Sequence, residues 1–220
     1  MPKAQQHTAA PLVPPKPTLP KLREVARGCK ACDLWKLGTQ TVFGEGASHA
    51  QVMFVGEQPG DKEDLEGKPF VGPAGNILNK ALEAAGIDRK QVYVTNAVKH
   101  FKWEPRGKRR IHKKPNQLEI LACRPWLEAE IAVVKPEVIV CLGATAAQSL
   151  LGKSFKVTER HGEIVPSQLA PFIVATLHPS SILRTPDEDK RHDQMAMFIN
   201  DLKKVSEVLH QPRSPVSRAA

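Results

Sequence analysis

The sequence has no long hydrophobic run, and its cysteines are few. Among its 220 residues no apolar stretch approaches the roughly 20 residues that a membrane-spanning helix needs, and the first 20 residues lack the apolar centre of a secretion signal. We therefore expect a cytoplasmic protein without a membrane partner. Four cysteines in a chain with no export signal also argue against structural disulfides.

Acidic residues are absent from the first 20 positions, which contain six of the 19 prolines. Such a composition buries too little apolar surface to fold alone, so residues 1–20 are predicted to form a disordered, weakly basic arm. Residues 211–220, QPRSPVSRAA, are predicted to form a second disordered tail. Residues 21–210 are long enough for one domain, and the basic charge with no exposed apolar motif favours a monomer.

Between these ends, hydrophobic runs that suit strands alternate with helical patterns. Strands are expected at residues 51–55, 92–95, 137–142 and 172–176. Helices are expected at residues 22–28, 74–85, 117–134, 144–151 and 188–209. The alternation predicts an α/β fold, a three-layer αβα sandwich with a central, mostly parallel four-stranded sheet. Ligands bind beyond the carboxyl ends of such strands, so the loops that start at Gly56, Asn96 and His178 are expected to form one site.

Positive charge is concentrated in residues 99–114, KHFKWEPRGKRRIHKK. Eight of these residues are Lys or Arg and only Glu104 is acidic, so the segment carries +7 of the chain's net charge of +9. This charge suits a polyphosphate backbone, and Phe101 and Trp103 offer planar faces on which unpaired bases can stack. We predict single-stranded or locally opened nucleic acid as the partner. The alternative is a disordered basic loop without a specific partner.

The four cysteines suit a metal site. They are Cys29, Cys32, Cys123 and Cys141, and the first two form a C-x2-C pair. Zinc and a [4Fe-4S] cluster can both be held by four thiolates, so the spacing does not choose between them. Alternatively, Cys123 and Cys141 are ordinary buried thiols.

Short motifs in the predicted loops resemble the uracil-DNA glycosylase superfamily. They read GEQPGD at residues 56–61, GPAG at 72–75, YVTN at 93–96 and HPSSILR at 178–184. Together they are similar to family 4, over residues 29–201. The resemblance implies a [4Fe-4S] cluster held by the four cysteines, with zinc as the alternative. It also implies an enzyme that flips uracil out of DNA, preferably single-stranded DNA, and excises it.

The insertion KRRIH at residues 108–112 resembles the UdgX-like branch, whose histidine becomes covalently attached to uracil-containing DNA. The resemblance implies that His112 attacks the sugar carbon C1′ and traps the enzyme after one turnover. Attack requires a neutral ring, which the flanking cations would favour by lowering its pKa. Two alternatives remain open. One is a conventional turnover glycosylase in which His112 contacts phosphate, and the other is a noncatalytic, metal-stabilised nucleic-acid-binding module.

Excision of uracil leaves a positive sugar and a negative base, so the site needs negative charge near the sugar and donors near the base oxygens. Glu57 and Asp61 are predicted for the first role and His178 for the second. Asn96 can read the uracil edge, and Phe70 can stack on the flipped base. The structural alternatives are that the acidic residues only cap a helix or form a turn, that Asn96 bonds the backbone, and that Phe70 belongs to the core.

The resemblance adds Gln58 to the uracil-binding residues. It also implies DNA contacts by charged and hydroxyl side chains of two loops, namely Lys108, Arg109, Arg110, Lys113, Ser180, Ser181 and Arg184. Arg110 is further expected to position its loop. His100, in the same basic segment, is expected to be a solvated residue.

Overall fold

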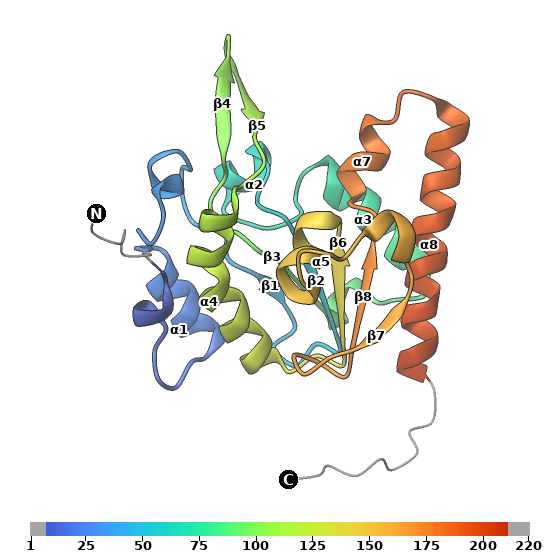
Figure 1. Cartoon of the computed structure of the whole chain (residues 1–220), viewed down its shortest axis with the longest axis horizontal. Helices are drawn as coiled ribbons and strands as arrows, with labels where there is room; N and C mark the ends of the chain where they lie inside the picture. Colours follow the sequence, from blue (N-terminus) through green and yellow to red (C-terminus); the bar gives the residue numbers. More distant parts are fainter. Residues whose placement is uncertain (1–7, 211–220) are drawn as a thin grey trace.

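The computed structural model describes residues 8–210 and confirms the predicted αβα sandwich (Figure 1). Its sheet has the strand order β1-β3-β2-β6-β8-β7. The strands are β1 (Glu45–Gly46), β2 (Val52–Gly56), β3 (Val92–Asn96), β6 (Val138–Leu142), β7 (Ile164–Pro166) and β8 (Phe172–Thr176). The four expected strands form the parallel centre, and β1 and β7 pair antiparallel at the two edges. These edge strands have two and three residues, too short to produce a recognisable pattern.

The central strands are buried along their whole length. Every residue of β2, β3 and β6 is buried, because helices cover both faces of the sheet. Gly56 at the end of β2 pairs with Asn96 at the end of β3, and Leu142 of β6 pairs with Thr176 of β8. The carboxyl ends of the four parallel strands therefore lie along one edge.

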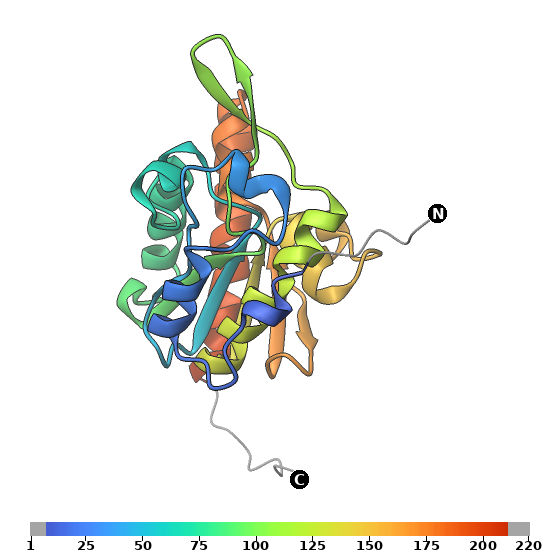
Figure 2. The same cartoon turned by 90° about the vertical axis from the view of Figure 1, so that its left-hand side faces the viewer.

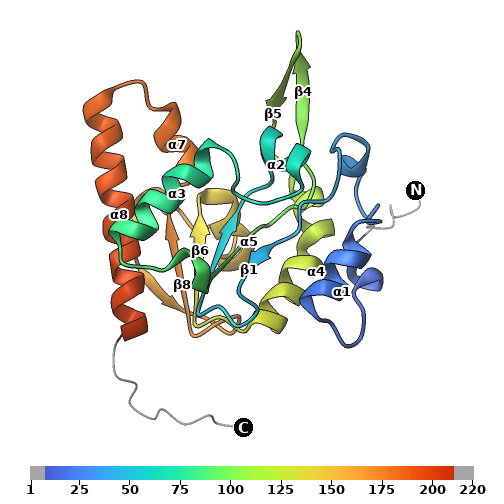
Figure 3. The ribbon, with the colours of Figure 1, turned by 180° about the vertical axis from the view of Figure 1, so that it is seen from behind.

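Two groups of helices form the outer layers (Figures 1 and 3). The longer helices are α1 (Leu19–Ala26), α3 (Pro73–Ala84), α4 (Gln117–Val134), α5 (Ala144–Leu151) and α8 (Glu188–His210). The short ones are α2 (Asp61–Glu66), α6 (Val157–Arg160) and α7 (Pro179–Arg184), with 3₁₀ turns at Ala10–Leu12, Asp33–Lys36 and Arg89–Gln91. One core contains residues of α4, α5 and α6, a second contains residues of α3, α7 and α8, and a third joins α1 to α4. Within residues 8–210, no helix has the length and apolar character needed to cross a membrane.

The basic segment folds into a β-hairpin that projects from the body of the molecule (Figures 1 and 2). Strands β4 (Trp103–Arg106) and β5 (Arg109–His112) pair antiparallel, with Trp103 opposite His112. Gly107 has a φ of 60° in the connecting turn, a conformation that glycine adopts without strain. The sequence did not predict these strands, because charged residues and Pro105 dominate their composition.

The amino-terminal part is more ordered than predicted. Ala9 is buried, and its N–H donates to the Ala122 carbonyl of α4 at 2.9 Å. Thr18 caps α1, which begins at Leu19. The prediction of a disordered arm is therefore wrong for residues 8–20, because contacts with the domain supply the apolar burial that the segment lacks by itself. Residues 1–7 and the predicted tail at 211–220 lie outside the described part of the chain.

Candidate active site

A pocket of about 860 Å³ lies beyond the carboxyl ends of the parallel strands, where the sequence predicted a site. Residues from five segments line it, among them Glu57, Gln58, Asp61, Phe70, Asn96, His112, Thr145, His178, Ser180 and Arg184. The three predicted loops therefore converge, and the hairpin adds His112 to them. Thr145, which follows β6, is a pocket residue that the sequence analysis missed.

Glu57 connects His112 to the body of the domain. Its Oε1 lies 3.3 Å from His112 Nε2, and its Oε2 accepts a hydrogen bond from the Thr145 hydroxyl. The two contacts engage different oxygens, so together they fix the plane of the carboxylate. A negative charge is thereby held beside an imidazole nitrogen at the pocket.

The pKa of His112 is lowered from its ordinary value of 6.5. Burial is the main cause, Arg184 lowers the pKa further, and Glu57 opposes both effects. The result agrees with the predicted direction but not with the predicted cause, which was the neighbouring cations of the same segment. The ring is therefore mainly neutral at pH 7, as a nucleophile must be.

His178 is held as a neutral hydrogen-bond donor. Burial, together with the smaller effects of Arg184 and His112, lowers its pKa to about 4. Its Nδ1 accepts from the Ser180 backbone N–H at 3.1 Å and lies 2.8 Å from the Ser180 hydroxyl. Because a backbone N–H can only donate, Nδ1 is unprotonated and the ring carries its proton on Nε2. This N–H can donate to an oxygen in the pocket.

Asn96 and Phe70 both line the pocket, and their side chains both approach Gly56. The Asn96 side-chain amide makes no hydrogen bond with any residue in the range 8–210, so its donor and acceptor are free for a ligand. A Cβ at Gly56 would lie 2.2 Å from Asn96 Oδ1, which explains why β2 ends in glycine. Phe70 has a φ of 57° and its ring stacks near His178, with centroids 6.4 Å apart.

Two predicted site residues have structural partners instead. The Gln58 amide donates to the carbonyls of Lys102 and Lys113 and accepts from the Lys102 N–H. Its side chain therefore holds the base of the hairpin and is not free to read uracil. Asp61 is half exposed and accepts from Arg110 Nε at 2.5 Å, so its carboxylate is engaged in positioning the hairpin.

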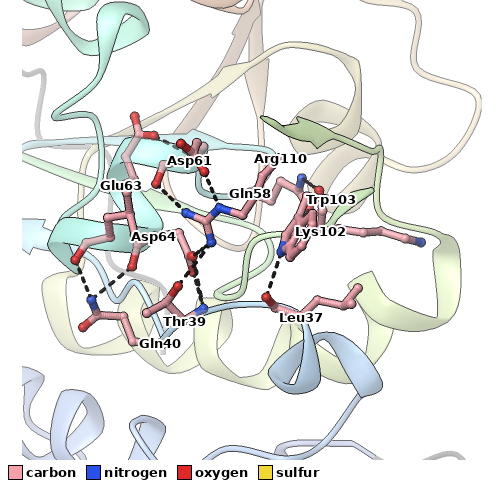
Figure 4. Close-up of polar contacts among 12 residues, drawn as sticks. Leu37, Thr39, Gln40, Gln58, Asp61, Glu63, Asp64, Lys102, Trp103 and Arg110 are labelled. Carbon is pink, nitrogen blue, oxygen red and sulfur yellow. Dashed lines mark hydrogen bonds and ion pairs between the residues drawn. The ribbon is translucent and has the colours of Figure 1, made fainter. Parts of the chain in front are cut away.

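Arg110 anchors the hairpin to α2 and does not point to solvent as a phosphate contact would (Figure 4). Its guanidinium binds Asp61 through Nε and Asp64 through Nη1, the latter at 2.7 Å. Asp64 is completely buried and also accepts from the Thr39 backbone N–H. The loop-positioning role is thus supported, and the predicted phosphate contact is corrected.

The other basic residues divide into paired and free side chains. Lys113 pairs with Glu104 at 2.7 Å, and Lys99 is buried against Glu130. Lys108 and Arg109 are exposed at the hairpin tip without an ion-pair partner among residues 8–210, and remain DNA-contact candidates. Phe101 is buried with its ring 6.1 Å from that of His112, so it supports the histidine and is not available for base stacking.

The predicted loop that starts at His178 caps α7, the helix that follows it. Ser181 Oγ donates to the His178 carbonyl, and the Ser180 hydroxyl accepts from Arg184 Nη1 at 3.1 Å. These contacts fix α7 at the rim of the pocket. Ser180 and Arg184 line the pocket and can still meet DNA there, whereas Ser181 does not line it.

Three of the four predicted metal ligands lie in one region. Cys29, Cys32 and Cys123 share a core, whereas Cys141 lies in another core and on β6, which β2 separates from β3. Burial raises the pKa of Cys123 to about 12, with smaller contributions from Cys32 and Cys29, but burial is the sole cause for Cys141. The structure therefore does not assemble the predicted four-cysteine site. A [4Fe-4S] cluster takes four such ligands, and the structure brings three of the predicted thiols into one region.

The comparisons with known proteins agree with this fold and pocket. Residues 43–203 match the family described as the uracil DNA glycosylase superfamily, so the chain belongs to that superfamily. The type-4 uracil-DNA glycosylase of Sulfurisphaera tokodaii is 35% identical over 204 residues, which cover 89% of this chain and 87% of the relative. The type-4 uracil-DNA glycosylase of Thermotoga maritima is 38% identical over 169 residues, covering 76% of this chain and 84% of the relative.

Proposed function

We propose that this chain is a uracil-DNA glycosylase that excises uracil and then becomes covalently linked to the DNA through His112. The observation that carries the proposal is the 3.3 Å contact between His112 Nε2 and Glu57 Oε1 at the pocket. Superfamily membership and the type-4 relatives support the excision step. The contact supports capture, because the carboxylate that attracts the sugar cation lies beside a nitrogen that can attack it.

In the excision step, a flipped uracil stacks on Phe70 and pairs with the free amide of Asn96. The bond between C1′ and the base nitrogen breaks, and both of its electrons leave with the uracil. His178 donates its Nε2–H to an oxygen of the departing anion, and Glu57 stabilises the sugar cation electrostatically. His178, with its lowered pKa, is neutral at pH 7, as its role as a donor requires.

In the capture step, the lone pair of His112 Nε2 forms a bond to the cationic C1′. Nε2 carries a proton while it is paired with the Glu57 carboxylate, so that proton must leave before the attack. Its loss gives the neutral tautomer with the proton on Nδ1, which leaves the Nε2 lone pair free. The alkylated ring is then an imidazolium, and loss of the Nδ1 proton makes it neutral. No good leaving group remains at C1′, so the adduct persists.

The alternative is a turnover glycosylase, in which water attacks C1′ and His112 binds phosphate. That role would place the histidine among the exposed cations of the hairpin tip. His112 instead lies at the opposite end of β5, above Phe101 and against Glu57. A noncatalytic binding module is disfavoured because phosphate binding alone has no use for an unpaired Asn96 amide.

The deciding experiment mixes the purified chain with a labelled single strand that carries one uracil. After boiling in detergent, a slow-migrating band on a denaturing gel should form with the uracil strand and not with a thymine strand. His112→Ser should lose the band, and His192→Ser, a change at an exposed histidine of α8, should keep it. A wild-type sample that gives alkali-labile strands but no band would indicate a turnover glycosylase, and a sample that gives neither would indicate the binding module.

Further proposals concern the DNA substrate, the location and oligomeric state of the protein, and its cofactor. We infer that the DNA is preferably single-stranded, since the pocket must receive a base that is already unpaired or easily flipped. We also propose a cytoplasmic monomer, and a [4Fe-4S] cluster with a structural role in which it ties residues 29–32 to α4. The chemistry above needs no electron transfer from such a cluster.

A further inference from the structure

The carboxylate of Glu63 connects two segments that line the pocket. Glu63 belongs to α2, lines the pocket and is 8% exposed. Its Oε2 accepts a hydrogen bond from the Gly60 N–H at 2.9 Å, and its Oε1 accepts one from the Gly72 N–H at 3.3 Å. Gly60 immediately precedes α2, and Gly72 immediately precedes α3. One side chain therefore binds the backbone at the start of two helices.

The two glycines leave the space that this carboxylate occupies. Gly60 has a φ of −89° and Gly72 a φ of −85°, values that any residue adopts, so the backbone conformation does not require glycine at either position. A Cβ at Gly60 would lie 2.5 Å from Glu63 Oε2, and a Cβ at Gly72 would lie 3.0 Å from Oε1. The close approach of Glu63 thus explains both glycines.

The bond to Gly72 reaches the segment that holds Phe70. Phe70 lies two residues before Gly72, and its φ of 57° is a conformation that a residue with a side chain keeps only where its surroundings hold it. A Cβ at Gly75 would overlap the Phe70 carbonyl oxygen, so the first turn of α3 packs directly on the Phe70 backbone. The position of the Phe70 ring therefore depends on where α3 begins.

The other acidic side chains of α2 bind a different part of the molecule. Asp61 and Asp64 both bind Arg110 of the hairpin (Figure 4). Glu63 lies between them in sequence and binds the start of α3 instead. The short helix α2 therefore connects the hairpin on one side to the segment of Phe70 on the other.

We propose that Glu63 is a positioning residue for uracil excision, which holds the Phe70 ring against the flipped base by linking α2 to the start of α3. This role rests on the proposed glycosylase function. Both oxygens of the carboxylate are engaged by backbone N–H groups, so Glu63 acts through Phe70 and not on the reacting atoms. The role requires the reach of the side chain as well as its charge, because the two N–H groups belong to different segments.

The first test measures amide hydrogen exchange without DNA, so it does not depend on the proposed function. Glu63→Gln has one acceptor oxygen and cannot bind both N–H groups, and Glu63→Asp keeps the charge but is one methylene shorter. Both should exchange faster than wild type over residues 68–76, with unchanged exchange in α4 showing that the domain remains folded. Glu66→Gln is the control, because it removes the same charge from the exposed end of α2, where Glu66 pairs with Lys62. Unchanged exchange over residues 68–76 in Glu63→Gln, or wild-type exchange in Glu63→Asp, would overturn the proposal.

The second test is a double-mutant cycle with Phe70→Leu, which keeps an apolar side chain but removes the stacking ring. Glu63→Gln should slow single-turnover uracil release by about tenfold when Phe70 is present. It should slow release by less than about twofold in the Phe70→Leu background, because the group that it positions is already gone. Equal effects in the two backgrounds would overturn the positioning role. Wild-type protein that releases no uracil would contradict the proposed function, and the exchange measurement would still decide whether Glu63 holds the segment.

Discussion

At the scale of single residues, Glu57 determines what the pocket can do. It is placed by two partners that are distant in sequence, Thr145 on one oxygen and His112 on the other. In the proposed capture, the same carboxylate stabilises the sugar cation and aligns the imidazole that attacks it. These two roles of Glu57 explain why His112 lies at the base of the hairpin and not at its tip.

Capture should depend on pH through His112. Its neutral form reacts and is populated above its pKa, and burial and Arg184 lower that pKa from 6.5. The rate of adduct formation should therefore stay near its maximum until the pH falls below 6.5 and then decline. Arg184→Gln removes one cause of the shift, so the midpoint of the decline should move to higher pH. The measurement is the single-turnover rate of adduct formation across pH.

Arg191→Gln is the control, because Arg191 lies on α8 and pairs with Glu188. It removes the same charge and should leave the midpoint unchanged. A midpoint that does not move in Arg184→Gln, or that moves to lower pH, would contradict the assignment of the declining limb to His112.

The sequence could predict most pocket residues but not their partners. Glu57, Asn96 and His178 follow strands, and the rule that parallel strands share a ligand-binding edge brings them together. Thr145 was missed because a threonine in the first turn of a helix is an ordinary residue there and carries no functional signal. Gln58 and Asp61 were assigned to ligand, whereas their partners on the hairpin are about 50 positions away and invisible to local patterns.

At the scale of elements, the hairpin acts as an arm clamped at its base. Arg110 joins β5 to α2, Gln58 joins the end of β2 to both sides of the hairpin, and Trp103 Nε1 donates to the Leu37 carbonyl at 2.8 Å. Three separate segments thus restrain the strand that carries His112. In the proposed capture, such restraint keeps the His112 ring within reach of C1′.

Loss of the Arg110 clamp should slow capture and destabilise the fold. Arg110→Gln leaves the buried Asp64 carboxylate without its cation, which costs about 3 kcal/mol in the free energy of unfolding. The rate of adduct formation should fall by about tenfold or more, as misplacement of a reacting group commonly produces. Denaturant unfolding and single-turnover gels measure the two effects.

Arg109→Gln provides the matched comparison at the adjacent position. It removes the same charge from an exposed side chain that has no ion-pair partner among residues 8–210. Its unfolding free energy should change by less than about 0.5 kcal/mol. Equal effects of the two substitutions on the free energy of unfolding would show that Arg110 acts through its charge alone and not through its contacts with α2.

The hairpin of β4 and β5 is also the element that the sequence could not predict. Long patterns such as that of α4, with a predicted range of 117–134, were recovered, because an apolar periodicity over many residues is informative. Residues 103–112 carry no such periodicity, and their pairing depends on a glycine turn and on contacts with the domain. Composition alone indicated a charged loop.

At the scale of the whole molecule, half of the basic segment's charge is neutralised within the fold. Its paired cations are Lys99, Lys102, Arg110 and Lys113, each within 2.8 Å of a carboxylate. The others are Arg106, Lys108, Arg109 and Lys114, which are exposed. The charge available to DNA is therefore smaller than the sequence indicated and is concentrated on the projecting hairpin.

Reversible DNA binding should depend on the exposed cations of the hairpin more than on cations elsewhere in the molecule. On a thymine strand, which cannot form an adduct, Lys108→Ala should weaken binding and reduce the slope of log K against log salt by about 0.7, the value for one contact with a single strand. Lys203→Ala on α8 removes an equal charge far along the chain and should leave the slope unchanged. Fluorescence anisotropy at several salt concentrations measures both. Equal changes of slope would show that net charge, and not the hairpin, controls binding.

The central claim is that the His112 ring forms the bond to DNA, and peptide mapping tests it most directly. The protein is reacted with a uracil-containing strand, digested with protease and nuclease, and analysed by tandem mass spectrometry. We predict one modified peptide, with a deoxyribose remnant on His112 and the loss of one uracil from the strand. A remnant on another side chain, or free uracil with an unmodified His112 peptide, would contradict the account.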